Sequence, residues 1–480
     1  MRTALRFTII CLACALLSHV PLTGIAAQQR DDQPRLTKIV ALTRHGVRSP
    51  TQSAATLSQW STRTWPQWPV PRGHLTPRGA RLVTAMWEDM RGRMLNLSLL
   101  PDAACPPPGK IFVRADVDQR TRATAKALVD GLCPDGSLSY AVSGQTPDPL
   151  FHPVQAGVQR FDPASVAASI IDNAGGDLDR LHEDSTSILT HMQHLSTPLG
   201  ADMCTRYNLP PSCGLADLPN SVSVEADGSG AGLSGALATA SGMAEIFLLE
   251  YAQWPDISAG WGQVDARVLR EVLPVHTSVF NAVNRAPVVA QLKGASLLSE
   301  MMAALEGTHR DQRCNAASLV VFVGRDTNIA NVGALLGVNW QMAGYPDNAT
   351  PPGSTLQFEL WEQGGRKEVR VRLFAQTPEA LHAPFEEQRL PAGGMVATPQ
   401  LTDPARTHKA TEAQVTAPPV VGEARFSLED FAKRVSRAIK NAPLAPQEVP
   451  PLRLRVDIEA DSATATTLKT EPTTATTITR

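Results

Sequence analysis

The sequence predicts an α/β protein: a mixed, mainly parallel sheet flanked by helices, with an inserted, mostly helical second domain. Three short runs rich in β-branched residues end in polar residues, as buried strands do: KIVALT (38–43), KIFVRA (110–115) and SLVVFVG (318–324). Residues 115–132 and 232–253 show a helical pattern, the first exposed on one side and the second mostly buried. Helical pattern dominates from about 136 to 275, which indicates the insertion.

The N-terminal segment is predicted to be a secretory signal over residues 1–27. Arg2 and Arg6 precede an apolar run, and the small residues of TGIAA follow, with cleavage near Ala26 or Ala27. A retained anchor is the alternative, but the run is shorter than the ~20 residues that span a bilayer. We therefore expect a periplasmic or secreted protein with no membrane partner after cleavage, and no other segment is predicted to cross a membrane.

The rest of the chain divides into four predicted segments. The α/β domain occupies 35–135 and 276–443, and the helical insertion occupies 136–275 between its two parts. From 444 to 480 the chain is rich in Pro, Thr and Ala and has no apolar periodicity. That composition predicts a disordered tail.

Length and charge narrow the function classes. The 480 residues are 43% hydrophobic, which is enough for a large core, and the length allows two to four domains. The net charge is −2, and loss of the two signal arginines brings it to −4. A nucleic-acid binder would normally carry a basic face, so nucleic acid is not expected as a partner.

Five cysteines remain after signal cleavage, in an oxidising compartment. Sequence alone does not fix their connectivity. Cys204 and Cys213 bracket a turn-rich segment and form an easy local pair, and Cys105 with Cys133 is the next simplest choice. Cys314 then remains as a buried free thiol. A zinc site is the competing interpretation, but no CxxC or Cys/His spacing supports it.

The segment RHGVR places Arg44, His45 and Arg48 at the end of a predicted strand. Ligand-binding loops lie at such ends of parallel sheets, and Gly46 gives the turn flexibility. Guanidinium groups match tetrahedral oxyanions, so a phosphate group is the simplest ligand, with His45 close enough to act on phosphorus. A basic turn solvated at the surface is the alternative for this motif taken alone.

Two further segments support the phosphate interpretation: ADVDQRTRATA (115–125) and VFVGRDTNIANVGALLGVNW (321–340). Together with RHGVRSP, the chain resembles the histidine acid phosphatases, branch 2 of the histidine phosphatase superfamily, and most of all their bacterial periplasmic phytase group. Other matching segments are WPQWPVPRGHLTPRG, DPLFHP, AEIFLLEYAQ and PDNATPPGSTLQFELW. The resemblance covers about 35–444. The mutase-like first branch lacks the proline after RHGVRS and much of the helical insertion.

The resemblance implies a role for each residue of the site. His45 would be the nucleophile that takes the phosphoryl group, and Asp326 the general acid that protonates the leaving oxygen. Arg44, Arg48 and Arg120 would bind the non-bridging oxygens. Phosphoryl transfer needs these three contributions on physical grounds as well. No metal or other cofactor is expected, and a neutral His45 beside a protonated Asp326 favours acidic conditions.

Arg325 departs from the family pattern, which has a histidine before the aspartate. An arginine could donate to the phosphate in place of that histidine, it could crowd the pocket, or it could pair with Asp326 and lower the pKa of the acid. Loss of the general acid would cost a factor of ~100 to 10,000 in rate. The alternative function is therefore a catalytically weakened or inactive phosphate-ester binding protein of the same fold.

The resemblance also aligns Thr51, Thr327 and Lys293 with the substrate pocket of the phytase-like members. Gln52 stands where those members often carry lysine, and Lys293 could equally be an ordinary solvated helix residue. His191 and His194 could be metal ligands, and Glu245 and His276 are expected to be structural groups. Asp116 could either orient the arginines or place a charge at a helix N-terminus. The sequence thus predicts a monomeric acid phosphomonoesterase that acts on a small phosphate ester, with phytate, a sugar 1-phosphate or a broad range of esters as substrate.

Overall fold

The computed structural model describes residues 33–103, 105–225, 228, 230–385, 408–416, 424–448, 450 and 452–453. The predicted signal segment and the part of the tail beyond 453 lie outside the described residues.

A nine-stranded mixed sheet forms the centre of the molecule. Its strands are β1 (Arg35–Arg44), β2 (Ile111–Ala115), β3 (Tyr140–Val142), β6 (Leu319–Gly324), β8 (Thr355–Gln363), β9 (Arg366–Ala375), β10 (Thr411–Glu412), β12 (Arg425–Ser427) and β13 (Leu452–Arg453). The order is β10-β9-β8-β1-β6-β2-β3-β13, with β12 also paired to β9. The four strands β1, β6, β2 and β3 run parallel, and the others pair antiparallel.

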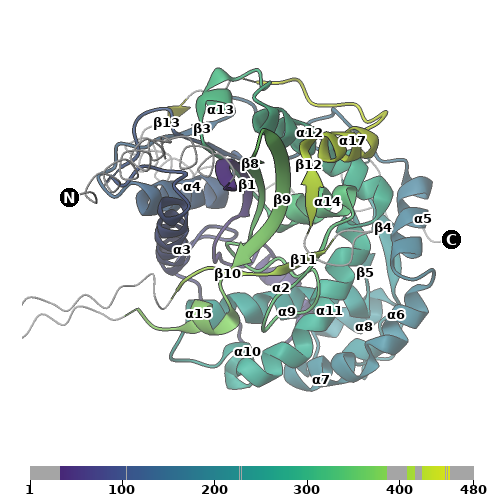
Figure 1. Cartoon of the computed structure of the whole chain (residues 1–480). Helices are drawn as coiled ribbons and strands as arrows, with labels where there is room; N and C mark the ends of the chain where they lie inside the picture. The colour runs from purple at the N-terminus through teal and green to yellow at the C-terminus, as the bar shows by residue number, and fades with distance from the viewer. Residues whose placement is uncertain are drawn as a thin grey trace, which may run out of the picture.

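Helices cover both faces of the sheet, so the buried strands are apolar on both sides. On β1, Ile39 and Ala41 pack with α3 (Pro77–Asn96) and α4 (Gln119–Leu132). The alternate residues Val40 and Leu42 pack in the cluster on the opposite face, formed by α12 (Pro287–Glu306), α14 (Asp326–Leu336) and α17 (Leu428–Ala438). Figure 1 shows α3 and α4 on one side of the strands and α12, α14 and α17 on the other.

A helical lobe lies beside the sheet and has its own core (Figure 1). It contains α5 (Pro163–Asn173), α6 (Leu178–Asp184), α7 (Thr186–Ser196), α8 (Ala201–Arg206), η1 (Leu215–Asp217), α9 (Ala236–Gln253), α10 (Ala259–Gly262) and α11 (Ala266–Asn284). The hairpin β4 (Ser221–Val224) and β5 (Ala231–Ser234) precedes α9. The remaining elements are α2 (Ala54–Trp60), α13 (Gln312–Ala316), α15 (Pro378–His382), and the paired strands β7 (Asn339–Gln341) and β11 (Gln414–Thr416).

The predicted fold class is confirmed, with shifts at several boundaries. The helix predicted over 115–132 begins at Gln119, because β2 continues to Ala115; the helix predicted over 232–253 begins at Ala236, because β5 precedes it. The insertion boundary at 136 falls before β3, which pairs with β2 in the central sheet, and the boundary at 275 falls within α11.

The C-terminal chain remains packed beyond the predicted start of the tail at 444. Residues Leu452 and Arg453 pair as β13 with β3, and Glu448 forms an ion pair with Arg114 at 3.3 Å. The described part of this segment, 444–448 and β13, is therefore held by an ion pair and by backbone pairing, and such contacts need no apolar periodicity in the sequence.

One helix departs from the expectation that no further segment is long and apolar enough to cross a membrane. By length and composition α12 passes that test, with a mean hydropathy of 1.2. However, 67% of its apolar window is buried inside the fold. A core helix of a soluble domain is as apolar as a spanning helix, and α12 lies against the sheet and α14.

The predicted disulfides are present in the structure, Cys105–Cys133 and Cys204–Cys213, and Cys314 is a buried free thiol. Burial, together with Asp311 and Glu300, raises the pKa of the Cys314 thiol to about 12.

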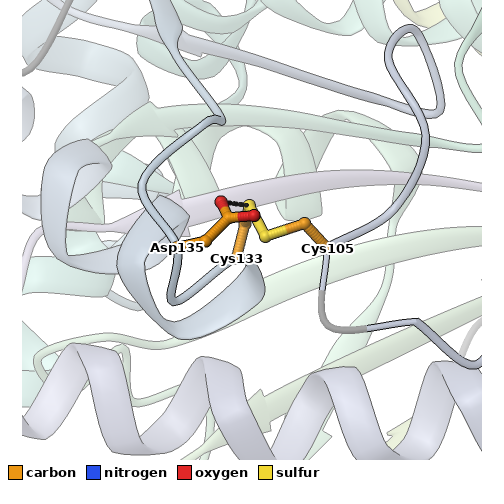
Figure 2. Close-up of side chains that lie close together, drawn as sticks. All are labelled: Cys105, Cys133 and Asp135. Carbon is orange, nitrogen blue, oxygen red and sulfur yellow. Dashed lines mark hydrogen bonds between the residues drawn. A yellow bond between two sulfur atoms is a disulfide. The ribbon is translucent and has the colours of Figure 1, made fainter.

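Figure 2 shows Asp135 beside the Cys105–Cys133 pair, with its carboxylate 3.0 Å from Sγ of Cys133. This trio is compact enough for a metal ligand set, but both sulfurs are used in the disulfide and neither is a free thiolate.

A buried carboxyl in the helical lobe should make stability depend on pH. Glu250 of α9 is 2% exposed; it accepts a 2.8 Å hydrogen bond from the Gly260 amide, and its other oxygen has no partner. Burial, only partly offset by that bond, raises the pKa of Glu250 from 4.5 to about 7. As pH rises between these two values the unfolded chain ionises before the folded one, so stability falls and reaches its full loss above pH 7.

We therefore expect Glu250→Gln to stabilise the protein by about 2 to 3 kcal/mol at pH 8 and to have little effect at pH 4. Urea unfolding at the two pH values measures this difference. The control is Glu306→Gln, at an exposed glutamate at the end of α12, which should change neither value appreciably. An equal effect of Glu250→Gln at both pH values would contradict the assignment.

Candidate active site

The parallel register brings three chain segments to one edge of the sheet. Arg44, the last residue of β1, lies opposite Gly324, the last residue of β6, and Val323 lies opposite Ala115 at the end of β2. The residues that follow the three strands therefore meet at the carboxyl edge. They are the RHGVR turn, Arg325 with Asp326, and the segment that begins at Asp116. This is the edge where ligand sites of such sheets form.

His45 is fixed by its own backbone and is 2% exposed. Its amide donates to Gly324 O at 3.1 Å, and its carbonyl accepts from the Gly353 amide at 3.1 Å. Nδ1 lies 2.9 Å from Gly46 O, so Nδ1 carries the proton and donates, which leaves the lone pair on Nε2. Burial and the charges of Arg44, Arg48 and Arg120 hold the pKa of His45 well below its usual range, so the ring is neutral.

Gly46 is required by space at this turn. A Cβ at this position would lie 2.7 Å from Cγ2 of Val83 and 2.9 Å from the carbonyl oxygen of Gly79, both on α3. The Gly46 amide also donates to Oγ1 of Thr124 at 3.1 Å, which ties the turn to α4. The helices on this face of the sheet therefore set the position of the imidazole.

Arg44 and Arg48 share one buried carboxylate. Nη2 of Arg44 lies 2.5 Å from Oε1 of Glu245, and Nη2 of Arg48 lies 3.6 Å from the same oxygen. Arg44 also donates to the carbonyl of Thr350. The second oxygen of Glu245 lies 3.4 Å from Nε2 of His276. Burial raises the pKa of Glu245, but Arg44, His276 and Arg48 outweigh it and lower the pKa, so Glu245 is a carboxylate that neutralises part of the cationic charge.

Arg120 and Arg325 share a second carboxylate, Asp118. Nη2 of Arg120 lies 2.6 Å from Oδ2 of Asp118, and Nη2 of Arg325 donates to the same oxygen. Nε of Arg325 lies 3.6 Å from Oδ2 of Asp116, which is fully buried and 2.8 Å from Nε2 of His152. The residue that departs from the family pattern is thus paired with two aspartates on the loop after β2.

Asp326 begins α14 and faces Arg44. Its Oδ2 lies 3.0 Å from Nη2 of Arg44, and its Oδ1 accepts the Thr327 amide at 2.7 Å. Burial would raise the pKa of Asp326, but Arg44, His45, Arg48 and the Thr327 amide outweigh it and hold the pKa well below its usual range. The pKa of Asp326 is therefore lowered, as a pair with Arg325 would have done, but the main cause is Arg44. Among the described residues no ion pair joins Asp326 to Arg325.

The three predicted pocket residues lie at the margins of this cluster. Thr51 is exposed and lies near Arg120, since both come within 4 Å of a Cβ built on Gly73. Thr327 follows Asp326 in the first turn of α14 and is partly buried. Lys293 of α12 is partly buried, with Nζ 5.6 Å from the centre of the Phe161 ring. Burial and then Arg325 lower the pKa of Lys293 to about 8, so it is no ordinary solvated lysine.

Four residues of the site were not predicted as functional from the sequence: two were expected to be structural, and two were not identified. Glu245 and His276 come from α9 and α11 of the helical lobe and complete the site around Arg44. Asp118 and His152 were not singled out. A signal for Asp118 was present, because it lies two residues before Arg120 in the DVDQR segment. His152 belongs to the DPLFHP segment that matches the family, but that match did not indicate its contact with Asp116.

Among the described residues only two groups are compact enough to hold a metal, the disulfide trio of Figure 2 and Asp116 with Asp118 and His152. In the second group Asp118 binds two guanidinium groups, and Asp116 contacts His152 and Arg325. Protein cations therefore already balance these carboxylates. His191 lies 3.5 Å from Glu271 and His194 is exposed; neither belongs to a metal-like group in the part of the chain described.

The fold and this cluster define the class of protein: an enzyme with a buried histidine between arginines at the carboxyl edge of a mixed sheet. The model of the histidine phosphatase superfamily (branch 2) matches residues 35–376. The chain is 34% identical to Phytase AppA of Escherichia coli (strain K12) over 396 residues, which are 78% of this chain and 90% of that protein. It is 26% identical to Glucose-1-phosphatase of Salmonella typhimurium, over 74% and 84% of the two chains.

Solved structures agree with the sequence relatives. The apo form of Hafnia alvei phytase superposes with a TM-score of 0.75 at 32% identity, and covers 86% of this chain and 99% of that one. The chain therefore belongs to branch 2 of the histidine phosphatase superfamily, as a histidine acid phosphatase, and the resemblance found in the sequence is confirmed.

Proposed function

We propose that the protein is an acid phosphomonoesterase that works through a phosphohistidine intermediate on His45. The observation that carries the proposal is the state of that imidazole: Nδ1 donates to Gly46 O, Nε2 has no hydrogen-bond partner among the described residues, and the charges of Arg44, Arg48 and Arg120 lower the pKa of the ring. A neutral imidazole with a fixed lone pair is a nucleophile, and the arginines attract the phosphate dianion that it attacks.

In the first step Nε2 of His45 bonds to phosphorus while the bond to the ester oxygen breaks. Arg44, Arg48 and Arg120 balance the charge on the three non-bridging oxygens. Asp326 gives its proton to the departing alkoxide, which leaves as an alcohol. In the second step water attacks the phosphorus, Asp326 takes the proton of that water, and the N–P bond breaks to release phosphate and neutral His45.

The low pKa of Asp326 is compatible with this role. The groups that depress it are the guanidinium groups that the substrate phosphate would neutralise, so binding of a dianion raises the pKa again. A phosphate monoester carries one proton below its second pKa of about 6 and can bring that proton to the site. We therefore expect kcat/KM to fall as pH rises through about 6, because the dianion with ionised Asp326 lacks the proton for the leaving group.

The position of Arg325 supports an active enzyme over the phosphate-ester binding protein. Its ion pairs are with Asp118 and Asp116, so it neither occupies the Asp326 carboxylate nor removes the general acid. For the substrate, the matched relatives named phytase and glucose-1-phosphatase support organic phosphate esters. Lys293 adds a positive charge close to Arg325, which favours a polyanion such as phytate over a monophosphate.

The predicted signal segment and the two disulfides support a periplasmic or secreted location, and we propose that the enzyme acts as a monomer.

The proposal is tested by turnover of phytate, glucose 1-phosphate and p-nitrophenyl phosphate at pH 5, followed by a denaturing quench in alkali. We expect hydrolysis of all three, fastest for phytate, and a phosphoenzyme that survives alkali but is lost in acid. Tight binding of phosphate without hydrolysis of any ester would favour the binding-protein alternative. Hydrolysis without a trapped phosphoenzyme would point to direct attack by water.

A further inference from the structure

Asp118 occupies a helix-capping position without capping the helix. It is the residue before the first turn of α4, where an aspartate normally accepts the backbone amides of that turn. Here its side chain makes no such hydrogen bond. The carboxylate turns instead toward the sheet edge, where one oxygen, Oδ2, contacts both Arg120 and Arg325. Asp118 therefore contacts two arginines of the site instead of capping the helix, as an aspartate at this position usually does.

The two guanidinium groups would repel each other without this carboxylate. Burial lowers the pKa of Arg120 to about 10, and the nearby charge of Arg325 is the next cause, while Asp118 acts in the opposite direction. Burial raises the pKa of Asp118, but Arg325 and Arg120 outweigh it and lower the pKa, so the group is ionised. One anion thus holds two like charges side by side.

The same carboxylate also resembles the substrate in its chemistry. A carboxylate oxygen between two guanidinium groups occupies donors that match a phosphate oxygen equally well. The side chain of Asp118 is 31% exposed, and those of Arg120 and Arg325 are 16% and 27% exposed, so a ligand can reach the trio from solvent. By contrast, Glu245, the anion on Arg44 and Arg48, is 9% exposed and lies behind those arginines in the helical lobe.

We propose that Asp118 is a positioning residue that holds Arg120 and Arg325 beside His45 and competes with the phosphate group for their donors. This inference rests on the proposed function and deepens it, because it concerns affinity for the phosphate that is bound and released in each turnover. Substrate and product phosphate must displace part of the Asp118 contact, which weakens phosphate binding and favours release of the product. Asp118 takes no part in bond making or breaking.

The test is calorimetric titration of the intact protein with inorganic phosphate at pH 5.5, comparing wild type with Asp118→Asn. Asparagine keeps the shape but removes the competing charge, so we expect the Kd for phosphate to fall by about fivefold, the scale of a partly exposed ion pair. The Ki of phosphate and the KM of esters should fall with it, while kcat does not rise. A merely structural role predicts weaker binding, not tighter binding.

Two further variants locate the effect. Asp130→Asn removes one acid from the same helix, three turns beyond the site, and should leave the Kd unchanged, which shows that net charge alone is insufficient. In an Arg325→Gln background Asp118 has one guanidinium fewer to hold, so Asp118→Asn should tighten phosphate binding less than it does in the wild type. Equal effects in both backgrounds would show that Arg325 is no part of the arrangement.

An unchanged or weaker affinity in Asp118→Asn overturns the inference. If that variant does not fold, Asp118→Ser removes the same charge with a smaller side chain and carries the same expectation. The outcome is separable from the proposed function. If Asp118→Asn bound phosphate more tightly but the wild type hydrolysed no ester, the inference would stand and the proposed function would be wrong. If the wild type hydrolysed esters but the Kd for phosphate were the same in Asp118→Asn, the proposed function would stand and the inference would be wrong.

Discussion

His45→Ala is expected to lower kcat by at least about 10⁴-fold on every ester, because it removes the group that we propose accepts the phosphoryl group from substrate. The backbone of the turn should survive the change, since the His45 amide and carbonyl bond to Gly324 and Gly353 and the Gly46 amide bonds to Thr124. Steady-state rates on p-nitrophenyl phosphate and phytate measure the loss. The trapped phosphoenzyme should also disappear.

The control is His194→Ala, which removes an exposed imidazole from α7 in the helical lobe and should leave the rate unchanged. Phosphate binding provides a second check. Arg44, Arg48 and Arg120 remain in His45→Ala, so the variant should still bind inorganic phosphate with an affinity within about tenfold of wild type. If His45→Ala bound phosphate normally and still turned over at a substantial rate, the nucleophile would lie elsewhere in the chain.

The part of the site that sequence could predict lies in short segments directly after strands. Arg44, His45 and Arg48 fall within five residues after a β-branched run, so their convergence needed no knowledge of tertiary structure. Arg120 and Asp326 come from other segments, and the resemblance to the family placed them beside His45. The parallel register of β1, β6 and β2 explains why these segments meet.

The part that sequence could not predict depends on which polar residue of a buried helix faces a cleft. Glu245 and Glu250 both lie in α9, five residues apart and both buried, yet one binds Arg44 and the other binds a lobe amide. Helical periodicity cannot tell which of the two glutamates faces the site, because α9 is buried on nearly every side. Only the docking of the lobe on the sheet distinguishes them.

The partner of Arg325 was open for a similar reason. The sequence left open whether the side chain of Arg325 would donate to the phosphate, crowd the pocket or pair with Asp326, its neighbour. The structure places it on Asp118 and Asp116, because the end of β2 lies beside β6 in the sheet. Strand order decides the contact, and strand order cannot be derived from the local pattern of residues.

Asp326→Asn is expected to separate esters by their leaving groups. Phytate and sugar phosphates release an alkoxide that needs a proton, so their kcat/KM should fall by about 10² to 10⁴-fold, the usual contribution of a general acid. Nitrophenolate leaves without protonation, so p-nitrophenyl phosphate should lose much less. Because Asp326 also neutralises Arg44, part of any loss common to all esters reflects a changed phosphate site rather than a missing proton.

Glu245→Gln is the matched control for that common loss, since it removes a different carboxylate from the same guanidinium group, at 2.5 Å from Arg44. Glu245 donates no proton in the proposed mechanism, so its variant should change the rates on phytate and p-nitrophenyl phosphate by similar factors. The ratio of the two rates, measured at pH 5 in both variants, therefore isolates proton transfer from charge balance. If Asp326→Asn left that ratio as it is in Glu245→Gln, the general acid would be another group, and the low pKa of Asp326 would mark it as a structural partner of Arg44.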